Sequence, residues 1–93
     1  MIKHIVMWRF NDPNDIDEAI GVLRAMEGNI ESLRSIEIGR DVVGSERSYE
    51  LAIYTSFDDL AGLQAYTDHP VHQPVIQWMR AHTKQSVAID YEA

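Results

Sequence analysis

The sequence predicts an α+β fold of the ferredoxin-like type, with elements in the order βαββαβ and one four-stranded antiparallel sheet. Four segments alternate apolar side chains with a period of two, which is typical of strands. Two further regions repeat apolar residues every three or four positions, which is typical of helices, and turn residues separate these segments. The 93 residues are expected to form a single domain over residues 1–93.

The first strand is expected over residues 2–10. Val6 and Trp8 alternate with Ile5 and Met7, so large apolar side chains occur on both faces. A strand that is wet on one side carries polar residues along that side. We therefore expect both faces of this strand to be covered.

The first helix is expected to follow a turn at residues 11–14. Asp15 is a candidate N-cap, with Glu18 three positions later as in a capping box, and Gly28 is a candidate helix stop. The apolar stripe comprises Ile16, Ala19, Ile20, Leu23 and Met26. This stripe predicts that one side of the helix lies against the sheet.

A hairpin is expected next, with strands over about 36–43 and 48–57 joined by a turn at 44–47. Gly39 interrupts the first of these strands and is a candidate for a β-bulge or bend. Val42 continues the apolar face of the same strand. The pair would form one half of the sheet.

The second helical region is expected to begin at an N-cap, either Ser56 or Asp58, with Leu60 facing inward, and to run to about Tyr66. Pro74 is expected either to kink the next helical piece or to mark its start. A fourth strand over residues 85–92 completes the pattern.

One sheet face stays bare in a single copy of such a fold, because both helices lie on the other face. Here the bare face would carry apolar residues such as Ile5 and Met7. Removing that face from water is favourable, so we expect two copies to pair through the open sheet face as a homodimeric α+β barrel.

Charge and composition exclude several classes of partner. The chain has 15 acidic and 8 basic residues, and the basic residues form no cluster, so neither nucleic acid nor an anionic membrane is an expected partner. Cysteine is absent, which excludes disulfides, thiolate metal sites and cysteine nucleophiles. The opening segment is too short and too charged for a secretory signal, so the expected location is cytoplasmic.

The segment from Tyr66 to His72 concentrates side chains that can move protons near neutral pH. It holds a phenol and two of the four histidines, beside Pro70. At a helix start, the positive end of the helix dipole would keep His72 neutral and able to act as a base. Tyr66 would donate a hydrogen bond to an enolate oxygen. The alternative is that His72 caps the helix and Tyr66 packs in the core.

The remaining histidines and aromatic residues have simpler interpretations. His4 shares a face with the core and needs a hydrogen-bond partner there, His69 is expected at the helix start, and His82 is expected to pack on the last helix. No third ligand accompanies His69 and His72, so a metal site is not expected. Most of the aromatic residues Trp8, Trp78, Phe57, Tyr54 and Tyr91 are expected to be core, although together they could line an aromatic pocket for a planar ligand.

Four pieces of the sequence together resemble the stress-responsive dimeric α/β-barrel (Dabb) family, in order and spacing over nearly the whole chain. They are Lys3–Val6, Gly39–Val42, Phe57 followed by Leu60, and Tyr66-x-x-His69-Pro70-x-His72. The resemblance implies a homodimeric barrel of ferredoxin-like protomers, in agreement with the pattern of the residues.

One branch of that family, the olivetolic acid cyclase-like polyketide cyclases, performs a cofactor-free intramolecular aldol condensation. The resemblance implies that the base of those enzymes falls on His72, their tyrosine on Tyr66, and a histidine that shapes the site on His4. A further tyrosine of the cyclases falls at Leu23 here, and the loop after the first strand is shorter.

The function that the resemblance implies is a cofactor-free lyase or cyclase that acts on a carbonyl-bearing small molecule in a small hydrophobic pocket. Two alternatives stay open. One is a non-catalytic, stress-associated barrel, and the other is a cofactor-independent monooxygenase, because related dimeric barrels host that reaction.

Overall fold

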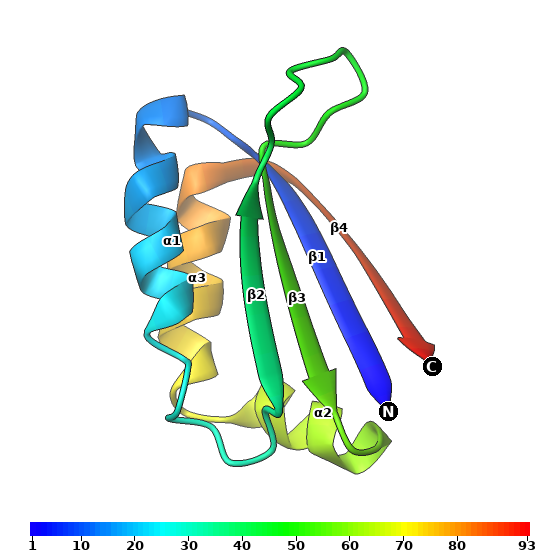
Figure 1. The fold of residues 1–93 in the computed structure, drawn as a ribbon. Helices are drawn as coiled ribbons and strands as arrows, with labels where there is room; N and C mark the ends of the chain where they lie inside the picture. Colours follow the sequence, from blue (N-terminus) through cyan, green and yellow to red (C-terminus); the bar gives the residue numbers. More distant parts are fainter.

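The computed structural model describes all 93 residues and has the expected βαββαβ order, with the second helical region divided into two helices (Figure 1). The sheet is antiparallel, with the strand order β2-β3-β1-β4 of a ferredoxin-like fold. The elements are β1 (Ile2–Phe10), the 3₁₀ turn η1 (Pro13–Asp15), α1 (Ile16–Arg24), β2 (Ser35–Arg40), β3 (Leu51–Phe57), α2 (Leu60–Asp68), α3 (His72–His82) and β4 (Thr83–Glu92).

Helices α1 and α3 lie side by side against one face of the sheet, and α2 lies across the end of the sheet where β1 begins (Figure 1). A core of 14 buried apolar residues fills the space between the layers. Alternate residues of the two central strands form its floor, namely Ile2, Trp8 and Phe10 of β1 and Leu51, Ile53 and Phe57 of β3.

The register of β1 decides which side chains of the neighbouring strands lie beside its own. His4 is paired with Thr55 on β3 and with Asp90 on β4, and the Thr55 hydroxyl donates to the His4 carbonyl at 3.1 Å. Because successive residues of a strand point to opposite faces, these three residues share the helix-covered face with Trp8. Met7 belongs to the opposite face.

The start of α1 corrects the expected capping box at Asp15. Asp15 already has helical backbone and makes no side-chain capping bond. Asp12 is the residue with extended backbone, and its carboxylate accepts a hydrogen bond from the Asn14 N–H at 2.9 Å to start η1. An N-cap side chain reaches the first turn only from extended backbone, which explains the shift to Asp12.

The cap of α2 is Asp59, so the expected caps Ser56 and Asp58 were both wrong. Asp59 has extended backbone, and its Oδ1 accepts from the Gly62 N–H at 2.8 Å. Leu60 is the first residue of the helix and is 67% exposed, which also corrects its expected inward orientation.

The hairpin is shorter than expected, and a loop over residues 41–50 joins its strands. β2 ends at Arg40, and Val42, expected on its apolar face, is 95% exposed in the loop. The Asp41 carboxylate accepts from the Gly44 N–H at 2.6 Å and thereby turns the chain out of the sheet. Gly39 lies in an unbroken register with β3, so the expected bulge is absent.

Helix α3 begins at His72, two residues before Pro74, so Pro74 does not mark the start of the helix. Proline is tolerated in the first turn because the N–H groups there have no intrahelical acceptor. None of the helices is long and apolar enough to cross a membrane. β4 begins at Thr83, directly after the last residue of α3, so no loop separates α3 from the strand that pairs with β1.

The sheet face away from the helices is uncovered in one copy of the chain (Figure 1). Its exposed apolar residues come from β1 and β4 and include Met7, Val87, Ile89 and Tyr91, with Ile89 57% exposed. The chain itself thus covers only one face of β1. If both faces of β1 are covered, as the sequence predicts, a second molecule must cover the open one.

Candidate functional site

The bend between α2 and α3 brings Tyr66 and His72 together. Tyr66 lies near the end of α2, His72 is the first residue of α3, and His69 and Pro70 form part of the link. The His69 N–H donates to the Tyr66 carbonyl at 3.2 Å, and the His72 N–H donates to the His69 carbonyl at 2.9 Å. The ring centroids of Tyr66 and His72 are consequently 4.2 Å apart.

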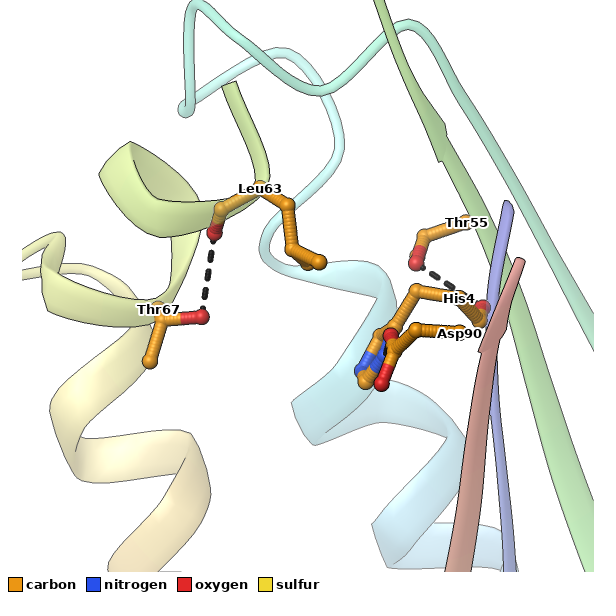
Figure 2. Close-up of polar contacts among 5 residues, drawn as sticks. All are labelled: His4, Thr55, Leu63, Thr67 and Asp90. Atoms are coloured by element: carbon orange, nitrogen blue, oxygen red, sulfur yellow. Dashed lines mark hydrogen bonds and ion pairs between the residues drawn. The ribbon is translucent and has the colours of Figure 1, made fainter. Parts of the chain in front are cut away.

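His4 reaches the same place from the sheet, with its ring centroid 6.0 Å from that of Tyr66. Figure 2 shows His4 and Asp90 projecting side by side from β1 and β4, where His4 Nδ1 is hydrogen-bonded to Asp90 Oδ1. An ionised carboxylate only accepts hydrogen bonds, so Nδ1 carries the hydrogen. Asp90 therefore fixes the orientation of the His4 ring and leaves Nε2 free.

Asp90 is a site residue that the sequence reasoning missed. In the sequence it is one polar member of an alternating strand, next to Ile89 and Tyr91. The available signal was that an acidic residue falls on the face opposite to these apolar residues. It becomes a partner of His4 only once the register of β1 with β4 is known.

The three predicted residues His4, Tyr66 and His72 line one cavity of about 320 Å³, within the range of small-molecule sites. Nine of its 14 lining residues are hydrophobic, and none is Asp or Glu. Its apolar wall includes Val6, Trp8, Leu23, Met26, Val75 and Met79, which come from the sheet, α1 and α3 or directly follow α1. Leu23 is one of the residues that make this wall apolar.

The imidazole of His72 is suited to accept a proton. Its Nδ1 lies 3.2 Å from the Thr67 carbonyl oxygen, which can only accept, so Nδ1 carries the hydrogen and Nε2 of the neutral ring is free. Burial, the largest cause, lowers the pKa of His72 below its ordinary value of 6.5, and the hydrogen bond to the Thr67 carbonyl opposes this shift in part. The sequence predicted a neutral ring from the helix dipole, but burial is the largest cause.

The hydroxyl of Tyr66 is suited to donate a hydrogen bond. The residue is only 2% exposed, and its ring also packs against Phe57 with centroids 5.0 Å apart. Burial raises the pKa of Tyr66 to about 12, so the phenol keeps its proton at neutral pH. At neutral pH, Tyr66 is therefore a protonated donor and His72 a neutral acceptor.

His69 and His82 have the structural contacts that their positions suggested. His69 Nδ1 accepts from the Val71 N–H at 3.1 Å and its Nε2 lies 3.3 Å from a carboxylate oxygen of Glu31. His82 stacks on Trp78 with ring centroids 3.8 Å apart. Neither residue lines the cavity, and no three His, Cys, Asp or Glu side chains converge as metal ligands.

Of the five aromatic residues considered for a pocket, Trp8 lines the cavity and the other four do not. Tyr54 and Tyr91 pair with β1 residues of the open face, since a strand alternates its side chains between faces. Trp78 stacks on His82, and Phe57 is buried behind Tyr66. The cavity wall is consequently aliphatic and thioether-rich.

Fold and site together define a ferredoxin-like α+β domain with a histidine- and tyrosine-lined apolar cavity under its helices. The chain belongs to the stress responsive A/B barrel domain family, whose model matches residues 2–93. It is 33% identical over 97 residues to an uncharacterized protein of Streptomyces coelicolor, and the match covers 99% of each chain.

Solved structures share this fold. A dimeric ferredoxin-like protein of unknown function from Thermobifida fusca has a TM-score of 0.88 and 26% identity, covering 99% of this chain and 90% of that one. A hydroxynitrile lyase from Passiflora edulis has a TM-score of 0.84 at 15% identity, covering 97% and 90%. An antibiotic biosynthesis monooxygenase has a TM-score of 0.79 at 15% identity, covering 100% and 98%. The last two show a shared fold alone.

Proposed function

We propose that the protein is a homodimeric barrel with a small hydrophobic pocket in each protomer, where a carbonyl-bearing molecule undergoes cofactor-free chemistry of the lyase or cyclase type. The observation that carries the proposal is the convergence of His4, Tyr66 and His72 on one apolar cavity. There the His72 imidazole, an acceptor, lies in contact with the Tyr66 phenol, a donor. Such a pair is what proton removal next to a carbonyl requires.

In the proposed reaction, His72 Nε2 takes a proton from the carbon next to the carbonyl group. The electron pair of that C–H bond moves to the carbonyl oxygen and forms an enolate, whose oxygen accepts a hydrogen bond from the Tyr66 hydroxyl. In a cyclase the enolate carbon attacks a second carbonyl of the same molecule, and the imidazolium returns its proton to the new alkoxide. A lyase runs this sequence in reverse: the base takes the hydroxyl proton, the C–C bond breaks as the new carbonyl forms, and the resulting enolate carbon takes the proton back.

His4 is a positioning residue in this proposal. Its ring lies 6.0 Å from that of Tyr66, and the Asp90 carboxylate holds it by Nδ1. The free Nε2 can then form a hydrogen bond with a ligand at the Tyr66 side of the cavity and keep that ligand in one orientation.

The homodimer is proposed to form through the open sheet face. Support comes from the exposed apolar residues of β1 and β4, among them Ile89, and from the structural neighbour of Thermobifida fusca, which is described as dimeric. Pairing two such faces would leave the helix-covered side, and with it the cavity, on the outside of each barrel half.

Of the two alternatives, the non-catalytic barrel predicts that side chains fill the space between His4, Tyr66 and His72. The cavity of about 320 Å³ supports a ligand there instead. The monooxygenase alternative is supported by the likeness to an antibiotic biosynthesis monooxygenase, which is a likeness of fold and not evidence of chemistry.

Hydrogen exchange of a simple ketone tests the proposal. The protein is incubated in D₂O with 2-octanone, and NMR follows deuterium uptake at the carbons next to the carbonyl group. The wild type is expected to accelerate uptake, and His72→Gln to lower that acceleration about a hundredfold. His69→Gln is the matched control, because His69 lies three residues away and outside the cavity. Equal rates for His72→Gln and wild type would contradict the assignment of the base.

A further inference from the structure

The cavity has a second polar end that the proposed acid–base chemistry leaves unused. Arg80, Thr83 and Ser86 lie in its wall. They come from the C-terminal end of α3 and the beginning of β4, whereas His72 opens α3 and Asp90, which holds His4, lies near the end of β4. The two polar groups therefore occupy opposite ends of the same elements.

The distance between the two polar ends is similar along the helix and along the sheet. On α3, His72 and Arg80 are eight residues apart, about 12 Å along the helix axis. On the sheet, Ser86 is paired with Trp8, which is four residues from His4 on β1, or about 13 Å. Apolar side chains, such as Val75 on α3 and Val6 on β1, line the cavity between the two ends.

The charge at the second end is the reverse of that of the protein as a whole. The chain has 15 acidic and 8 basic residues, yet the cavity wall holds no carboxylate and one cation, Arg80. Arg80 takes part in none of the four ion pairs of the structure. Arg9, Arg34 and Arg40 contact polar side chains, whereas Arg24, Arg47 and Arg80 do not. Of these three unpaired arginines, Arg80 is the one that lines the cavity. An unpaired guanidinium beside an apolar cavity is complementary to a carboxylate.

The hydroxyl groups beside Arg80 differ in what they offer. The Thr83 hydroxyl donates to the Met79 carbonyl at 2.6 Å, so its hydrogen is already used. Ser86 and Arg80 are both solvent-exposed, so they stand at the open mouth of the cavity. The Ser86 hydroxyl has no hydrogen-bond partner within the protein and can donate to a ligand there. Arg80 and Ser86 together supply the donors that a carboxylate group would accept.

We propose that the ligand of this cavity is a keto acid, with its carboxylate bound by Arg80 and Ser86 and its reacting carbonyl between Tyr66 and His72. The inference rests on the function proposed above and adds a second functional group to the substrate class. An apolar chain joins the two groups of the ligand and lies against the aliphatic wall. The cavity would thereby select substrates by length as well as by charge.

A matched pair of probes tests this inference. 7-Oxooctanoate carries a methyl ketone and a carboxylate at opposite ends of a short chain, and its methyl ester has the same ketone without the charge. Binding is measured by NMR on protein labelled at the methionine methyl groups. Met26 and Met79 line the cavity, whereas Met1 and Met7 do not, so the four signals report both affinity and location.

The wild type is expected to bind 7-oxooctanoate about five- to tenfold more tightly than the ester, with shifts confined to Met26 and Met79. Arg80→Gln is expected to abolish this preference by lowering the affinity for the acid. Arg47→Gln removes the same charge from the loop over residues 41–50, outside the cavity, and is expected to keep the preference.

The outcomes separate this inference from the function on which it rests. If the wild type binds the acid and the ester equally, or if Arg80→Gln keeps the preference, the carboxylate site at Arg80 is overturned. The proposed ketone site between Tyr66 and His72 then still stands. If neither probe shifts Met26 or Met79, the ligand cavity itself is overturned, and the keto acid with it.

Discussion

His72 and His4 each use Nδ1 to hold a protein acceptor, the Thr67 carbonyl for His72 and the Asp90 carboxylate for His4. In the neutral ring of His72 this leaves a lone pair on Nε2, and in His4 it leaves Nε2 without a protein partner. The ring of Tyr66 lies near both, with its centroid 4.2 Å from that of His72 and 6.0 Å from that of His4. The proposed chemistry depends on the contact between the phenolic donor of Tyr66 and the imidazole acceptor of His72.

The lowered pKa of His72 predicts a pH dependence with a defined sign. The proposed base is active when neutral, so the rate of ketone exchange should rise as the pH increases through a value below 6.5 and should be flat near neutrality. An NMR titration of the His72 ring measures that value directly. A midpoint at or above 6.5 would contradict the effect of burial.

The same shift links His72 to folding stability. The unfolded chain binds a proton at His72 near pH 6.5, while the folded chain resists it, so the free energy of unfolding should fall as the pH drops below 6.5. Denaturant unfolding of the wild type and of His72→Gln at several pH values checks this. In His72→Gln the free energy of unfolding is expected to fall less steeply below pH 6.5 than in the wild type. An equally steep fall in both proteins would show that other groups cause it.

Tyr66→Phe separates the hydroxyl from the packing of the ring. The ring contact with Phe57 should survive, so the melting temperature is expected to change little, whereas ketone exchange should slow about a hundredfold because the enolate oxygen loses its donor. Exchange at the wild-type rate in a folded variant would remove Tyr66 from the mechanism.

The helices and strands follow closely from the periodicity of the sequence, because burial on one face imposes a period that the residues must satisfy. Their ends follow less well. Two candidate aspartates precede α1 and two precede α2, and the backbone conformation decides whether Asp12 or Asp15, and Asp58 or Asp59, becomes the cap. Local sequence does not determine that choice.

The residues of the site also differ in how well the sequence predicts them. The motif around Tyr66 and His72 was predictable because its residues are neighbours in the chain. Asp90 and Arg80 were not, because they join the site only through the register of β4 with β1 and the placement of α3 on the sheet. Residue contacts over such separations depend on tertiary packing and leave no local pattern.

Replacing a helix cap tests the assignment at the level of elements. Asp59→Ala removes the acceptor for the Gly62 N–H and is expected to lower the free energy of unfolding by about 1 kcal/mol. Asp15→Ala is the comparison, because Asp15 makes no capping bond, and is expected to change it by less than about 0.5 kcal/mol. Equal losses in denaturant titrations would reject the cap at Asp59.

At the scale of the whole molecule, the two sheet faces have separate roles in this account. The helix-covered face carries the core and the cavity, while the open face carries exposed apolar residues of β1 and β4. A domain of this size buries a limited share of its apolar surface on its own, so the proposed pairing through the open face would add stability to the fold.

A charge on the open face should break the proposed dimer. Ile89→Lys places an ammonium group where two apolar faces would meet, and sedimentation equilibrium is expected to show monomers at concentrations where the wild type is dimeric. Leu60→Lys adds the same group to α2, away from this face, and should leave the dimer intact. Dimers of equal stability in both variants would mean that another surface forms the interface.

A crystal structure of the protein grown with 2-octanone tests the central claim most directly, because it reports the assembly and the ligand together. The account predicts two copies joined through their open sheet faces, with the ketone oxygen within hydrogen-bond distance of the Tyr66 hydroxyl and the neighbouring carbon facing His72 Nε2. A ketone bound outside the cavity, or a cavity closed by its own side chains, would contradict it.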